Sequence, residues 1–130
     1  MSDSNTIVSM IAGGAITEFA LVKINGAGKV EVATLATADS TFGVAQRAAS
    51  AGEAVDVVIH GVTRVISGAA LTLATTPILA VTTAGKVQAC QVADTTFFPV
   101  ARALPNVNQL TTADGDQMKV FFFGPVSRAS

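Results

Sequence analysis

The longest regular pattern in the chain is an alternation of apolar and polar side chains across residues 53–66. One side carries the apolar residues Val55, Val57, Ile59 and Val65. The other side carries the polar residues Asp56, His60 and Arg64. A period of two residues is typical of a β-strand with one buried face. Gly61 lies inside this run, and a glycine there often marks a bulge or a bend. We therefore expect a long, bent strand.

Shorter β-favouring runs occupy most of the remaining chain. Residues 19–24 and 29–33 flank the sequence Asn-Gly-Ala-Gly, which predicts a hairpin because glycine adopts turn conformations at little cost. Runs of the same kind predict a second hairpin, with strands at residues 78–81 and 86–90. They also predict strands at residues 42–45, 97–103 and 117–123. Since no stretch predicts a long helix, the expected fold class is all-β, a compact barrel or sandwich of short strands.

The strand pattern occurs twice, over residues 19–62 and again over residues 78–125. Equivalent glycines lie 57 positions apart at the hairpins and 63 apart at the long strands, where Gly61 corresponds to Gly124. The second copy therefore contains a net insertion of six residues. The fold is expected to be built from this internally duplicated unit.

The length and the repeat number define the expected domain organisation. At 130 residues the chain has the length of one domain, and two copies are fewer than an open repeat array needs. Polar residues without a clear period precede the first glycine pair. The sequence therefore predicts a single β domain over residues 13–130, preceded by an extended N-terminal arm over residues 1–12.

The composition predicts a surface that another protein covers. Half of the residues are hydrophobic and 13% are charged, and the mean hydropathy is +0.55. No apolar run approaches the ~20 residues of a membrane-spanning helix, so no membrane association is expected. Apolar surface outside a membrane favours an oligomer or an assembly component. The eight Lys and Arg residues are scattered singly and the net charge is −1, so nucleic acid is not an expected partner.

The residues that could support catalysis lack suitable neighbours in the sequence. His60 is the only histidine and Cys90 the only cysteine, and neither lies in a metal-ligating or nucleophilic cluster. Carboxylates recur at equivalent places in the two copies, as Asp39 with Asp94 and Glu53 with Asp116, which is typical of turn residues that bond their own backbone. We therefore expect no catalytic, cofactor or metal site, and no enzyme activity.

Three stretches of sequence resemble a known family. They are LVKINGAGKVEVA (residues 21–33), FGVAQRAASAGEAVDVVIHGV (residues 42–62) and SGAALTLATTPILAVTTAGKVQAC (residues 67–90). On these stretches the chain is similar to the small capsid decoration, or cement, proteins of tailed bacteriophages. The last third of the chain, which includes LPNVNQLTTADGDQMKVFFFG, departs from that pattern.

The resemblance implies a structural protein of the virion that has no active site. Such a protein binds the outer surface of the phage head and stabilises contacts between major capsid protein subunits. The resemblance also implies synthesis in the host cytoplasm and a homo-oligomer, with a trimer favoured over a dimer. A host-receptor or carbohydrate-binding module on the virion surface is the alternative, although the chain has no Trp or Tyr for stacking on sugars.

Three segments are the expected contacts with the capsid or between subunits. The arm contributes apolar side chains, the loop inserted in the second copy contributes polar and apolar ones, and the last strand contributes consecutive aromatic rings: Ile7, Val8, Met10, Ile11; Asn106, Val107, Asn108, Leu110; and Phe121, Phe122, Phe123. Neighbouring strand residues face opposite sides of a sheet, so the aromatic run presents at least one ring on each side. Deleting residues 2–11 is expected to weaken attachment without unfolding the domain.

Overall fold

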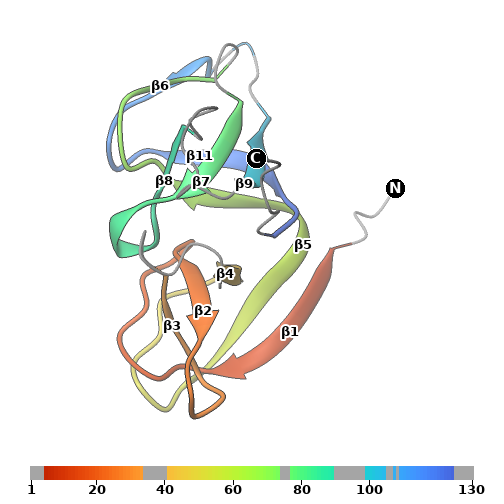
Figure 1. The fold of residues 1–130 in the computed structure, drawn as a ribbon, viewed down its shortest axis with the longest axis vertical. Coiled ribbons are helices and arrows are strands. Elements are labelled where there is room, and N and C mark those ends of the chain that lie inside the picture. Colours follow the sequence, from red (N-terminus) through yellow and green to blue (C-terminus); the bar gives the residue numbers. More distant parts are fainter. Residues whose placement is uncertain are drawn as a thin grey trace, which may run out of the picture.

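The long strand β5 (Ala54–Ile66) passes through both lobes of the molecule and joins them (Figure 1). The computed structural model describes residues 5–33, 41–73, 77–89, 99–104, 107 and 109–124. The other strands are β1 (Thr6–Ile11), β2 (Leu21–Ile24), β3 (Val30–Val32), β4 (Thr41–Ala45), β6 (Leu71–Thr72), β7 (Ile78–Val81), β8 (Val87–Ala89), β9 (Pro99–Ala103), β10 (Thr111–Thr112) and β11 (Gln117–Phe122). A short 3₁₀ turn lies at Thr83–Gly85. The protein is therefore all-β, as its sequence predicts.

The alternation in β5 follows the predicted faces. Val55, Val57 and Val65 are buried, whereas His60 and the charged residues of the opposite face are exposed. Gly61 has a φ of 131°, which places the expected bend at the middle of the strand. The strand thus directs one face to the interior, whereas the opposite face is exposed at its charged residues and buried at Val58.

The order of the strands in the main sheet is symmetric about β5 and β11. The order is β3-β2-β4-β5-β11-β9-β7-β8, so the hairpin β2–β3 and strand β4 have counterparts in the hairpin β7–β8 and strand β9. Val22 pairs with Val32, and Leu79, 57 positions after Val22, pairs with Ala89. The pairing of β2 with β4 and that of β7 with β9 contain a register shift at the same point. The predicted duplication is confirmed by this topology.

The first copy begins earlier than the sequence pattern indicates. Met10 of β1 pairs with Val55, just as Val65 in the second half of β5 pairs with Met118. In the first copy, strand β1 therefore occupies the position that the second half of β5 occupies in the second copy. The segment predicted as an arm is, over Thr6–Ile11, a strand paired with β5 along its length. Its sequence shows no clear period because apolar residues occur on both of its faces.

The alignment of the two copies also changes at strand β9. The sequence pattern places Pro99 in the position of Gly43, but the pairings equate Gly43 with Ala101, since Gly43 lies opposite Val22 and Ala101 lies opposite Leu79. The difference is two residues, which leaves every side chain on the same face of the sheet. Pro99 begins the strand, where its missing N–H donor is tolerated.

Two clusters of buried side chains form the interior, one in each lobe. The first lobe comprises β1 to β4 and the first half of β5, and the second comprises the rest of β5 and β6 to β11 (Figure 1). Leu21, Ala33 and Val44 of the first lobe belong to the cluster of the second. In addition, the Gly85 N–H donates to the Ala33 carbonyl at 2.9 Å. The lobes are therefore packed directly against each other.

Replacing Gly61 by alanine is expected to lower the free energy of unfolding by about 2–3 kcal/mol, because its φ of 131° disfavours any Cβ. A Cβ there would also overlap the Asn5 side chain, whose amide bonds the N–H and C=O of Val62 at 3.0 and 2.7 Å. Gly124 is the matched control, since it has a positive φ of 83° but open space around its Cβ position. Its replacement by alanine should cost about 1 kcal/mol. Urea denaturation of both variants measures the difference, and equal losses would contradict the role of Asn5.

Candidate interaction surface

Strand β1 presents two exposed isoleucines and packs two other apolar residues inward. Ile7 is 53% exposed and Ile11 is 42% exposed. Val8 and Met10 are half-buried against the core of the first lobe. The first pair is therefore available to a partner, whereas the second pair holds the strand on its own lobe.

The loop inserted in the second copy carries the most exposed large apolar residue in the described part of the chain. Val107 is 89% exposed and Leu110 is 52% exposed. The Leu110 carbonyl accepts a hydrogen bond from the Leu73 N–H at 2.9 Å, which holds this part of the loop beside β6. Asn106 and Asn108, also expected as contacts, lie outside the described residues.

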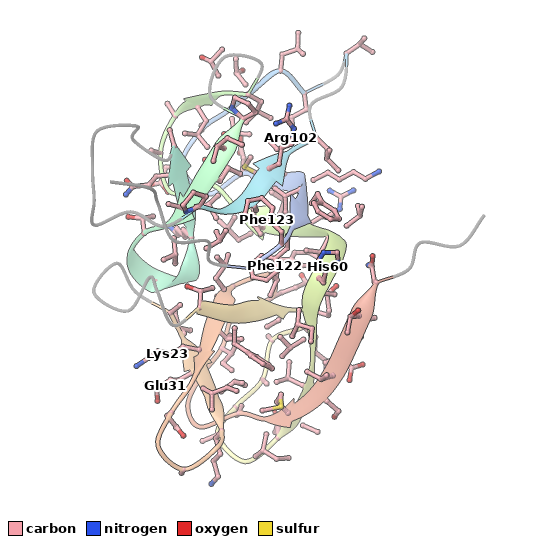
Figure 2. All side chains as sticks on the ribbon, turned by 45° about the vertical axis from the view of Figure 1, so that its right-hand side comes forward. Lys23, Glu31, His60, Arg102, Phe122 and Phe123 are labelled. Carbon is pink, nitrogen blue, oxygen red and sulfur yellow. The ribbon has the colours of Figure 1, made fainter. Side chains whose placement is uncertain are left out.

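The three consecutive phenylalanines divide between the interior and the surface. Phe122 is fully buried in the core of the second lobe, so it is removed from the set of expected contact residues. Phe121 and Phe123 are half-buried on the opposite face, with ring centroids 6.5 Å apart. The His60 ring meets Phe121 edge-on, at 5.1 Å and 85°. In the view of Figure 2, Phe123 lies between Arg102 and His60.

Three cations lie on the same face of the sheet as these rings. Lys119 pairs with Arg64 across β11 and β5, and Phe121 pairs with Arg102 across β11 and β9. Paired residues share a face of the sheet, and all three cations are exposed. We call Arg64, Arg102, Lys119, Phe121 and Phe123 the aromatic-cationic face. Sequence reasoning missed it, because the cations are far apart in the chain and only the strand register brings them together.

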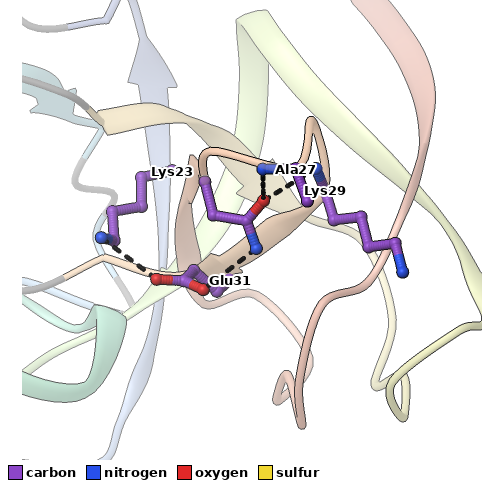
Figure 3. A network of polar contacts seen from close by, with 5 residues as sticks. Lys23, Ala27, Lys29 and Glu31 are labelled. Atoms are coloured by element: carbon purple, nitrogen blue, oxygen red, sulfur yellow. Dashed lines mark hydrogen bonds and ion pairs between the residues drawn. The ribbon is translucent and has the colours of Figure 1, made fainter.

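A polar network stabilises the first hairpin (Figure 3). The Asn25 Oδ1 accepts from the N–H groups of Ala27 and Lys29 at 2.9 and 3.1 Å, and its amide donates to Glu31 at 3.2 Å. Glu31 also pairs with Lys23 at 3.1 Å. The hydrogen bond from Lys23, and secondly that from Asn25, lowers the pKa of the Glu31 carboxyl. These groups are therefore engaged in holding the turn.

The carboxylates singled out in the sequence have structural roles where they are described. Glu53 accepts from the Ser50 N–H at 2.7 Å, and Asp116 accepts from the Ala113 N–H at 2.9 Å, in equivalent turns of the two copies. In the part of the chain that the structure describes, no three His, Cys, Asp or Glu residues come together as metal ligands. Over the same residues, no helix has the length and apolar character needed to cross a membrane. Asp39, Cys90 and Asp94 lie outside the described residues.

Fold and surface together define a small, internally duplicated all-β protein with exposed apolar and cationic side chains on its strands. No family model matches the chain, and no curated protein matches it. Among solved structures, it is similar to the N base of the head fiber protein gp8.5 of bacteriophage phi29. The TM-score is 0.63 at 14% sequence identity, and the match covers 95% of this chain and 99% of that chain. At this identity the likeness is one of fold.

Proposed function

We propose that the chain is a structural protein of a tailed-phage virion that binds the outer surface of the head and stabilises contacts between major capsid protein subunits. The observation that carries the proposal is the likeness in fold to a head fiber base, which extends over 95% of the chain. The resemblance of residues 21–33 and 42–62 to decoration proteins points independently to the same place in a virion.

The exposed apolar side chains supply a physical basis for attachment. Ile7 and Ile11 on β1, and Val107 and Leu110 on the inserted loop, are exposed to water in the isolated chain. Burying a side chain of this size against a partner contributes about 1–2 kcal/mol. A protein that binds only the assembled shell raises the stability of the shell by mass action. We further propose that the chain acts as a homo-oligomer, with a trimer favoured, because several linked contacts strengthen attachment through avidity.

The proposal predicts that purified protein binds heads that were assembled without it and makes them more resistant to heat. Replacing Ile7 and Ile11 by serine is expected to weaken this binding by about thirtyfold or more, because the partner then buries two hydroxyl groups instead of two aliphatic side chains. Co-sedimentation with the heads measures the bound fraction.

The matched control is Ile24→Ser, since Ile24 is 43% exposed and lies on the separate hairpin of β2 and β3. That variant should bind as the wild type does. If the wild-type protein failed to bind heads and left their heat resistance unchanged, the proposed function would be wrong. If the double variant bound as well as the wild type, β1 would be excluded as a contact.

A further inference from the structure

We infer that the aromatic-cationic face binds an acidic polypeptide segment, in which carboxylates engage the cations and an apolar side chain packs on Phe121 and Phe123. Such a segment on the capsid surface would supply the partner for the proposed function. The affinity for an acidic segment is inferred from the residues of the aromatic-cationic face. Only the assignment of that segment to the capsid rests on the proposed function.

The fold does not require the cations. Lys119 lies directly opposite Arg64 in an antiparallel pair, where side chains are about 5 Å apart at Cβ and like charges destabilise the sheet. In the equivalent pair of the first copy, Asp56 lies opposite Ser9, and this repulsion is absent. The same architecture thus forms without the two cations, which indicates that they serve a contact outside the lobe.

These cations have no ionic partner within the described residues. Lys23 pairs with Glu31, Lys86 pairs with Asp114 at 3.3 Å, and Arg47 donates to backbone carbonyls. Arg64, Arg102 and Lys119 make no such contact in the described part of the chain, and all are exposed. As far as the described residues go, their guanidinium and ammonium groups can therefore bind carboxylates, for which arginine offers two parallel donors.

Phenylalanine rings and cations occur together on this face only in the second copy. The positions of Phe121 and Phe123 correspond to Val58 and His60 in the first copy, 63 residues earlier. Half-buried rings bordered by cations suit a chain that alternates acidic and apolar residues. Nucleic acid fits less well, because three cations on a protein of net charge −1 supply few phosphate contacts.

The test titrates the full-length protein with a short peptide of alternating Glu and Leu, followed by the backbone amide signals in NMR spectra. The expected result is that signals of β5, β9 and β11 shift and that binding weakens as salt is added. Arg102→Gln and Lys119→Gln should each weaken binding about threefold. Lys29→Gln, a neutralised exposed cation at the tip of the first hairpin, should leave it unchanged. The Lys119 variant also removes a like-charge contact, so its thermal midpoint should be equal to or above that of the wild type.

Three outcomes would overturn the inference: no binding of the peptide, shifts confined to other strands, or an equal effect of Lys29→Gln. Tighter binding of single-stranded oligothymidylate to the same face would assign that face to nucleic acid instead. A peptide of alternating Lys and Leu should not bind. If the acidic peptide binds as expected but the protein does not bind heads, the binding face stands and the proposed function fails.

Discussion

Replacing Phe122 by alanine is expected to lower the free energy of unfolding by about 3–5 kcal/mol, because it removes a fully buried ring and leaves a cavity. The ring belongs to the core of the second lobe, and its neighbours across the strands are Gly61 and Ala101, which offer little bulk to fill the gap. Urea denaturation followed by circular dichroism measures the loss. A loss of this size is a large fraction of the stability of a typical domain.

The next residue in the chain provides the matched control. Phe123→Ala should cost less than about 1.5 kcal/mol, because its ring is only half-buried and lies on the outer face. Phe123→Ala should also weaken binding of the acidic peptide. Phe122→Ala, by contrast, should leave the affinity of the folded protein for the peptide unchanged. Equal losses of stability in the two variants would contradict the assignment of the two rings to opposite faces.

Deleting residues 2–11 is expected to destabilise the protein by at least about 3 kcal/mol, in contrast to the expectation from the sequence. The deletion removes β1 and its backbone hydrogen bonds with β5, each of which contributes about 0.5–1.5 kcal/mol. It also removes Val8 and Met10, which pack against the buried cluster of the first lobe. Thermal unfolding monitored by circular dichroism measures the effect.

Serine substitutions at the outer face of β1 provide the control for this deletion. Ile7→Ser and Ile11→Ser keep the strand and change only exposed side chains, so their thermal midpoints should lie close to that of the wild type. If the truncated protein retained the midpoint of the wild type, the pairing of β1 with β5 would contribute nothing to stability. Loss of head binding on deletion alone would therefore not identify a contact, whereas loss in the serine variants would.

The sequence predicts those parts of the fold in which one face of a strand is clearly apolar. The alternation in β5 and the glycines of the first hairpin lead to the observed strands, and the spacing of Gly61 and Gly124 leads to the observed equivalence of β5 and β11. Strand β1 is missed because its adjacent pairs Ile7–Val8 and Met10–Ile11 give no period of two. Its place becomes visible only in the structure, where β1 pairs with the first half of β5 as the second half of β5 pairs with β11.

The candidate surface is less predictable, because it depends on register between strands that are distant in sequence. Alternation alone indicates that Phe122 faces away from its neighbours, but not which side is the interior. The grouping of Arg64, Arg102 and Lys119 requires the pairing of β11 with both β5 and β9. A sequence with scattered single charges can therefore fold to a locally cationic face.

The two copies meet inside β5, between His60 and Gly61, without any linker residues. Because Leu21 and Val44 also pack against the other lobe, we expect the two lobes to move as one rigid unit. The exposed side of β1 and the aromatic-cationic face are thereby held at a fixed separation and orientation. Simultaneous engagement of two sites depends on a match between their spacing and that of the target. The protein would thus distinguish surfaces by their dimensions as well as by their chemistry.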